Sequence, residues 1–165
     1  VEALGLNKKL TVGKHAMKSV DKLDIGVAIE IEGQLRVAVI RDVANKSESD
    51  IKADIEGFIE KGPRLTPEDQ NLESVCYVLT SLGKLSPESV EPTLPKGVTG
   101  ILGIGRQIDG KSRFTFTLCH ATLTGSEGAS LLMDIAEKVS DIGPETQAVR
   151  TPRIQFRHGN GRSSS

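Results

Sequence analysis

Two β-branched runs stand side by side in this chain and constrain its fold more than any other feature. They read IGVAIEI (25–31) and LRVAVIR (35–41), and the connection Glu32-Gly33-Gln34 separates them. Two such runs around a short connection that contains glycine predict a β-hairpin. An isolated hairpin is marginally stable in water, so further elements must cover its apolar face.

The segment after this hairpin predicts a helix, three strands and a second helix. Ser47 and Asp50 form a capping-box pattern, and apolar residues then recur at helical spacing until Gly62. The order β-β-α-β-β-β-α predicts an α+β fold. The remaining elements are a very short helix at 66–69, strands at 74–80, 99–106 and 114–120, a hairpin turn at Asp109-Gly110 and a helix at 126–140.

The chain is organised as one core with an extension at each end. Residues 1–24 carry five lysines with little periodicity, and we expect an irregular N-terminal arm or linker with room for a short helix. Residues 25–143 form the predicted core domain. The segment 144–165 is a basic tail, for which solvation and docking onto a partner both stay open.

Composition excludes several classes of function. The net charge is −1 and only four Phe and one Tyr are present, so we expect no nucleic-acid partner. No apolar run approaches the roughly 20 residues of a membrane span, so we expect no membrane partner. Cys76 and Cys119 lack metal-ligand spacing, which predicts no metal site, buried reduced thiols and a reducing compartment.

Two motifs suggest chemistry that the surrounding sequence does not support. Gly103-Ile104-Gly105 follows a strand, but the next glycine is Gly110 and a hairpin follows, so this is no nucleotide-binding fingerprint. These glycines more simply allow another backbone to approach closely. A trio of Ser81, His120 and Asp134 contains the residue types of a hydrolase triad, but nothing in the sequence places them together.

Five short motifs between residues 24 and 141 resemble, in order, the catalytic domain of the dihydrolipoamide acyltransferases, which form the cores of 2-oxo acid dehydrogenase complexes. The resemblance implies a chloramphenicol-acetyltransferase-like fold, a mixed sheet packed with helices, here shortened at the N-terminus. The first motif is the segment DIGVAIEIEGQLRVAVIRDVANKS (24–47), in which Ile40-Arg41-Asp42 matches the family's I-R-D. The other four are Leu65–Asp69 for L-x-P-E-D, YVLTSLG (77–83) for F-T-I-S-N-L-G, ILGIG (101–105) for I-L-G-V-G, and CHATLTG (119–125) for D-H-R-x-x-D-G.

The resemblance also implies the position of a vestigial site. His120 stands where the family has its general base, and Thr80 stands where a serine hydroxyl stabilises the oxyanion. Thr124 replaces the aspartate whose carboxylate fixes the histidine loop, and we expect this loop to be loosened. The other motif positions are Ser81 in place of an asparagine, Ala121 in place of an arginine, and the glycines Gly83 and Gly125.

These replacements favour a non-catalytic member, similar to the core domain of the dihydrolipoamide dehydrogenase-binding component (protein X) of pyruvate dehydrogenase complexes. The resemblance then implies a mitochondrial homotrimer that anchors to the dihydrolipoamide acetyltransferase core and binds no cofactor. Dihydrolipoamide dehydrogenase would bind through a domain outside this chain. The alternative is an active acyltransferase, with His120 as general base and Thr80 as oxyanion donor, that receives coenzyme A and a lipoyl arm.

Overall fold

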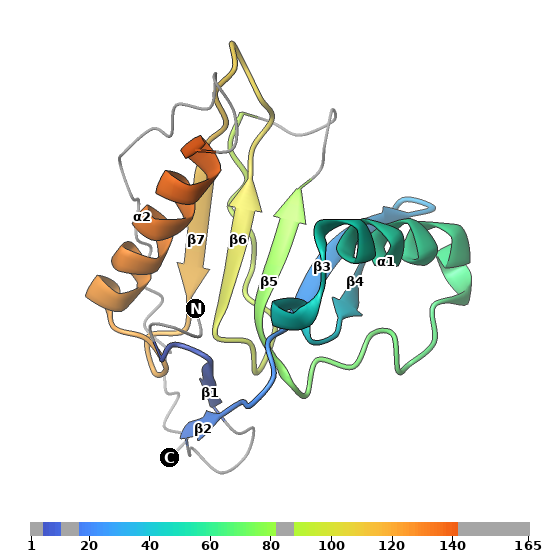
Figure 1. The fold of residues 1–165 in the computed structure, drawn as a ribbon, viewed down its shortest axis with the longest axis horizontal. Coiled ribbons are helices and arrows are strands. Elements are labelled where there is room, and N and C mark those ends of the chain that lie inside the picture. The colour runs from blue at the N-terminus through green and yellow to red at the C-terminus, as the bar shows by residue number, and fades with distance from the viewer. Residues whose placement is uncertain (1–4, 11–16, 82–87, 142–165) are drawn as a thin grey trace, which may run out of the picture.

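The computed structural model describes residues 5–10, 17–81 and 88–141, and its centre is a five-stranded mixed sheet (Figure 1). The sheet has the order β4-β3-β5-β6-β7. Its inner pairs, β3 with β5 and β5 with β6, are parallel, and its outer pairs are antiparallel. The strands are β3 (Asp24–Ile31), β4 (Gln34–Ile40), β5 (Val75–Ser81), β6 (Gly100–Ile104) and β7 (Phe114–Leu118).

The predicted hairpin is confirmed, with a connection one residue shorter than expected. Ile31 pairs with Gln34, so only Glu32-Gly33 forms the turn. Both residues have positive φ, 51° and 75°, which is the backbone of a type I′ turn. Asp109-Gly110 has the same pair of φ values, 51° and 75°, and forms the second predicted hairpin turn.

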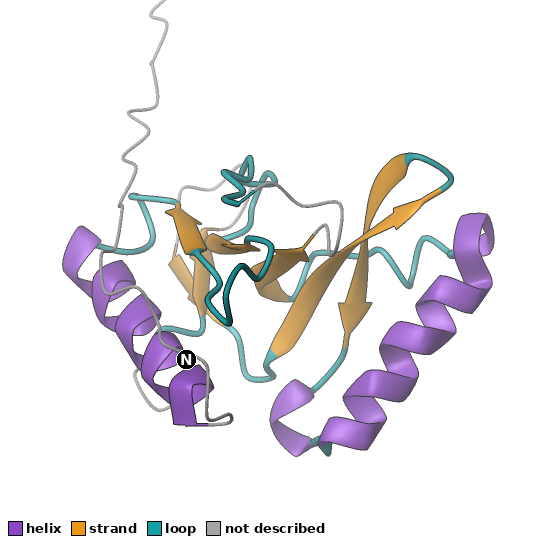
Figure 2. Ribbon diagram, turned by 90° about the horizontal axis from the view of Figure 1, so that it is seen from above, coloured by secondary structure: helices purple, strands orange, loops and turns teal. Residues whose placement is uncertain are grey.

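Two helices cover one face of the sheet, α1 (Glu48–Lys61) over β3 and β4 and α2 (Gly125–Asp141) beside β7 (Figure 2). The capping box at the start of α1 is confirmed, because Ser47 and Asp50 each bind the other's backbone amide. Gly62, with φ of 52°, ends this helix. Short 3-10 helices lie at η1 (Val43–Asn45) and η2 (Gly62–Arg64).

The opposite face of the sheet is covered by the irregular segment 88–98. Val98 packs there against a buried cluster that includes Val78 and Ile101. The Thr117 hydroxyl donates a hydrogen bond to the Pro92 carbonyl oxygen at 3.2 Å. The parallel strands are therefore buried on both faces, which explains the near-continuous apolar sequence of β5.

The described part of the N-terminal arm forms two short antiparallel strands, β1 (Lys8–Leu10) and β2 (Met17–Ser19), where we allowed for a short helix. Leu6, just before β1, is buried in the main core, and its carbonyl oxygen accepts a 2.6 Å hydrogen bond from the Tyr77 hydroxyl. These residues are therefore packed against the core. The domain boundary that we placed after residue 24 stays a prediction, and the basic tail lies outside the described residues.

The expected short helix at 66–69 is a pair of turns instead. Thr66 and Asp69 bind each other's backbone amides, as at a helix start, with distances of 3.1 and 2.9 Å. The Asp69 carbonyl oxygen, however, accepts a hydrogen bond from the Val39 amide of β4 at 2.8 Å. This bond joins the segment to the edge of the sheet, so the chain does not continue as a helix.

Candidate active site

His120 lies at the exposed tip of a tight turn between β7 and α2. The Cys119 amide donates to the Thr99 carbonyl oxygen at 2.8 Å, which fixes the start of the turn to β6. The Cys119 carbonyl oxygen accepts three hydrogen bonds, from the amides of Thr122 and Leu123 and from the Thr122 hydroxyl, at 2.8–3.0 Å. Leu123 is 1% exposed and anchors the turn in the core. Our prediction of a loosened loop is therefore wrong for the backbone of this turn, which these hydrogen bonds and the buried Leu123 hold in place.

Thr124, which the resemblance places at the position of the family's aspartate, acts as the N-cap of α2. Its hydroxyl accepts from the Glu127 amide at 3.2 Å, and the Glu127 carboxylate accepts from the Thr124 amide at 2.7 Å. The Thr124 amide and then Lys8 lower the pKa of Glu127 to about 2. The Thr124 side chain therefore serves the helix start as a neutral hydroxyl and brings no charge to the turn.

The N-terminal arm is bound directly beside this turn. Lys8 Nζ lies 3.0 Å from Glu127 Oε1, and the Lys8 carbonyl oxygen accepts from the Thr99 hydroxyl at 2.5 Å. Lys9 Nζ donates to three carbonyl oxygens at the start of β5, those of Leu72, Glu73 and Val75, at 2.8–3.1 Å. Burial lowers the pKa of the Lys9 ammonium. The arm thus links β5, β6 and α2 around the base of the His120 turn.

Thr80, the expected oxyanion donor, lies at the far end of the sheet from His120. Thr80 pairs with Gly103, and Gly103 pairs with Thr115 near the start of β7. His120 lies beyond the opposite end of β7, and the three residues from Thr115 to Leu118 alone extend about 10 Å along the strand, at about 3.3 Å per residue. Thr80 is also 4% exposed, on a strand that helices and segment 88–98 cover on its two faces. One copy of the chain therefore does not bring Thr80 and His120 together.

The remaining predicted site residues are also divided between the Thr80 end and the His120 end of the sheet. Ser81 is the exposed last residue of β5, beside Thr80, while exposed Ala121 and the first helical residue Gly125 lie near His120. Gly83 lies outside the described residues. Because Ser81 is at the opposite end of the sheet from His120, the hypothetical triad with Asp134 is not assembled.

The family-like motif Ile40-Arg41-Asp42 has a structural role in this chain. Arg41 Nη1 donates to Asp24 Oδ2 at 3.0 Å, and the Ser74 hydroxyl donates to the same oxygen at 2.6 Å. The Asp42 amide donates to the other Asp24 oxygen at 2.8 Å. Arg41 Nη2 also binds the carbonyl oxygens of the 66–71 turns. This network fastens β3, β4 and the start of β5 to one another.

The glycines of β6 allow a close backbone approach, as predicted. A Cβ at Gly103 would lie 2.7 Å from the Val90 carbonyl oxygen, and one at Gly105 would collide with the carbonyl oxygen of Glu88. Segment 88–98 can therefore lie directly on the sheet.

The cysteines and the acidic residues are also possible site residues. Cys76 is buried and Cys119 partly buried, and both are free thiols. Among the residues placed by the structure, no group of three or more His, Cys, Asp or Glu could hold a metal ion. The same part of the chain has no helix long and apolar enough to span a bilayer.

Sequence reasoning missed Glu127 and Lys8 as partners of the site. The spacing of Thr124 and Glu127 is a capping-box signal just before an apolar helix, so Glu127 could have been found. Lys8 lies 119 residues from Glu127 in the chain, and no local pattern predicts that contact.

The sequence matches known proteins over most of its length. Residues 5–141 match the family described as 2-oxoacid dehydrogenases acyltransferase (catalytic domain). The dihydrolipoyllysine-residue acetyltransferase components of the pyruvate dehydrogenase complexes of Buchnera aphidicola and Pseudomonas aeruginosa are 20% and 23% identical to this chain over 148 residues. These matches cover 82% of this chain but only 37% and 27% of the two relatives.

Solved structures have the same fold. A dihydrolipoamide acetyltransferase of Azotobacter vinelandii superposes with a TM-score of 0.71 at 24% identity, over 85% of this chain and 63% of that one. A truncated catalytic core of the Thermoplasma acidophilum 2-oxoacid dehydrogenase multienzyme complex gives 0.71 at 19% identity, over 85% and 67%. The cubic core of a pyruvate dehydrogenase multienzyme complex gives 0.66 at 23% identity, over 86% and 63%. The chain therefore belongs to the acyltransferase catalytic-domain family of the 2-oxoacid dehydrogenases.

Proposed function

We propose that this chain is a non-catalytic assembly domain in the core of a pyruvate dehydrogenase complex. The observation that carries the proposal is Thr124, whose neutral hydroxyl caps α2 at the position of the family's aspartate. The resemblance implies that a carboxylate at this position fixes the histidine loop through a charge-assisted hydrogen bond. The nearby Glu127 carboxylate is already shared between the Thr124 amide and Lys8.

In this proposal the chain is the core domain of the dihydrolipoamide dehydrogenase-binding component (protein X). It forms homotrimers in the mitochondrial matrix that dock onto the dihydrolipoamide acetyltransferase core, and it binds no cofactor. Dihydrolipoamide dehydrogenase binds through a domain outside this chain. Family membership supports the place in the core, since two relatives are pyruvate dehydrogenase components and one solved relative forms a cubic core.

The separation of Thr80 from His120 supports an assembly role for the two ends of the sheet. Side chains at opposite ends of one sheet meet only when a second copy places one end of its sheet against the other end of the first. A site of the acyltransferase type would then lie between subunits. In this proposal, that contact between the sheets of two copies holds the assembly together and does not catalyse a reaction.

A second candidate function is an active acyltransferase, and the firmly held turn at His120 favours it. An exposed imidazole on an ordered backbone is suited to removing a thiol proton from coenzyme A or a dihydrolipoyl arm. Thr80 of a second copy would supply the hydroxyl that stabilises the oxyanion.

Acetyl transfer from acetyl-CoA to dihydrolipoamide distinguishes the two functions. For an assembly domain, we expect the wild-type chain and a His120→Ala variant to give the same background rate. A transfer rate that His120→Ala abolishes would establish the active enzyme instead. An acetyltransferase catalytic domain of the family, assayed in parallel, controls for the substrates.

A further inference from the structure

The connection between β6 and β7, residues Gly105–Arg113, forms a narrow projecting hairpin, which we call the finger (Figure 1). The Gly105 amide donates to the Arg113 carbonyl oxygen at 2.8 Å and closes its base. Ile108 and Lys111 exchange two backbone hydrogen bonds, of 2.8 and 2.9 Å, at its tip. A type I′ turn lies between them, so backbone hydrogen bonds close the finger both at its base and near its tip.

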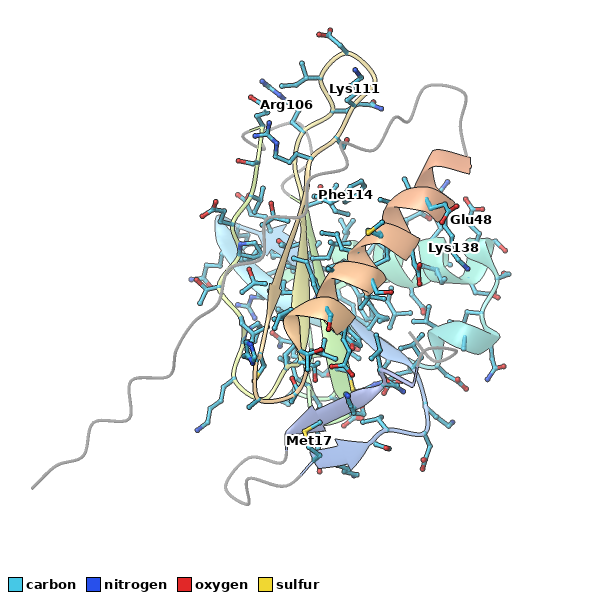
Figure 3. The ribbon with its side chains drawn as sticks, turned by 90° about the vertical axis from the view of Figure 1, so that its left-hand side faces the viewer. Met17, Glu48, Arg106, Lys111, Phe114 and Lys138 are labelled. Atoms are coloured by element: carbon cyan, nitrogen blue, oxygen red, sulfur yellow. The ribbon has the colours of Figure 1, made fainter. Side chains whose placement is uncertain are left out.

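The finger combines an exposed apolar side chain with positive charge. Ile108 is 38% exposed. The exposed cationic residues Arg106 and Lys111 lie at the projecting end of the molecule, in the same hairpin (Figure 3). Asp109 is the single carboxylate within the finger. Arg113 Nη2 binds Glu88 Oε1 at 3.0 Å and ties the base of the finger to segment 88–98.

The other hairpin of the sheet has the same turn and the opposite charge. Leu35 next to the β3–β4 turn is 59% exposed, so this tip also presents an apolar side chain. Glu30 and Glu32 surround it with exposed carboxylates. The positive charge of the finger is therefore local to that hairpin. The chain as a whole has a net charge of −1.

We infer that the finger docks this domain onto the acetyltransferase core, at a surface of the core that presents carboxylates around an apolar contact. The inference rests on the proposed function and specifies the surface that performs it. Exposed charges steer association and make it dependent on salt, while a central apolar side chain contributes most of the affinity. A tip fixed by reciprocal hydrogen bonds loses little conformational freedom on docking.

The test measures binding of the full chain to a purified, immobilised dihydrolipoamide acetyltransferase core from the same source. We expect Ile108→Asp to weaken binding roughly tenfold, as loss of a central contact does. Lys111→Glu should slow association and reduce its dependence on salt between about 0.05 and 0.3 M. Leu35→Asp, the matched change on the acidic hairpin, should bind as the wild type does. Thermal unfolding of all three variants, which change exposed positions, reports whether each is folded.

Each result decides one of the two claims. Wild-type chain that does not bind the core overturns the proposed function itself. Binding that is strong and equal in the wild type and both finger variants overturns only the role of the finger. Equal weakening by Leu35→Asp and Ile108→Asp also overturns that role, because it indicates non-specific apolar contact. A change of oligomeric mass in the finger variants overturns it as well, because it indicates that the finger binds a second copy of this chain.

Discussion

The buried carboxylate of Asp24 accepts hydrogen bonds from three separate groups, the Arg41 side chain, the Asp42 amide and the Ser74 hydroxyl. Burial alone raises the pKa of such a group. The bonds from Ser74 and Asp42 and the charge of Arg41 outweigh that effect, so the pKa of Asp24 lies below its ordinary value. At the scale of single residues, the family-like motif therefore holds three strands together through one charge.

Replacing Asp24 with asparagine should destabilise the fold by about 2–3 kcal/mol, because Arg41 and Ser74 lose their shared acceptor while Arg41 keeps its charge. Urea unfolding at neutral pH measures this change. Ser74→Ala removes one neutral donor and should cost only about 1 kcal/mol. Equal losses in the two variants would contradict a dominant role for the carboxylate.

The lowered pKa of Asp24 also predicts a pH dependence. A carboxyl whose folded-state pKa lies below its unfolded value stabilises the fold above that unfolded value. This stability is lost as the pH falls from about 4 towards the lowered pKa of the folded state. Urea midpoints between pH 7 and pH 3 should therefore fall more steeply for the wild type than for Asp24→Asn, and parallel curves would rule this out.

The two cysteines should react with a thiol reagent in a fixed order. Burial raises the pKa of the Cys76 thiol from 9.0 to about 11, and the side chain is fully buried, whereas Cys119 is partly exposed beside the His120 turn. Only the thiolate is nucleophilic, so Cys119 should be labelled in the native state and Cys76 only on unfolding. Mass spectrometry of partly labelled protein identifies the site. Early labelling of Cys76 would refute the order.

At the scale of elements, the candidate site runs directly into α2. Thr124 is a residue of the site motif and also the N-cap of this helix. Thr124→Ala removes the acceptor for the Glu127 amide and should cost about 1 kcal/mol, a typical value for a lost N-cap. Thr124→Ser keeps the hydroxyl and should restore most of that stability. Thermal and urea unfolding compare the three proteins, and an unchanged Thr124→Ala would show that the cap is dispensable.

Two glycines should respond to alanine in opposite directions. At Gly105 the added Cβ would collide with the Glu88 carbonyl oxygen, so we expect segment 88–98 to be displaced and stability to fall by about 2 kcal/mol or more. At Gly57 in α1, nothing lies within 4 Å of the added Cβ. Alanine there should stabilise the fold by roughly 0.5–1 kcal/mol, because glycine is costly in a helix. Chemical unfolding of both variants tests the contrast.

At the scale of the whole molecule, local sequence patterns predicted most helices, strands and turns. Long-range contacts determine how the N-terminal arm packs and where the site residues lie. The Ser47 capping box and the Asp109-Gly110 turn involve residues close in sequence, and both were predicted. The packed arm was not, because Lys9 binds carbonyl oxygens that lie 63–66 residues away. For the site, the motifs led us to predict roles for Thr80 and His120, but the sheet order that separates these two residues is a property of the folded chain.

The two edges of the sheet lead to a prediction about assembly. β4 and β7 each have one side without a neighbouring strand in the described sheet, and such edges are normally paired or covered. We expect light scattering to give three times the mass of one chain. A monomer at micromolar concentration would contradict the trimer and would require each edge to be protected by its own side chains.

The contacts of the arm also set the order in which the fold can be completed. Lys8 and Thr99 are 91 residues apart, and Leu6 and Tyr77 are 71 apart. Contacts across such long loops are costly to form early, because the loop must close before the contact contributes. The arm precedes β5 and β6 in the sequence, so the groups that it binds exist only after those two strands have been made. It is therefore made before the strands that hold it and is among the last of the described segments to be placed.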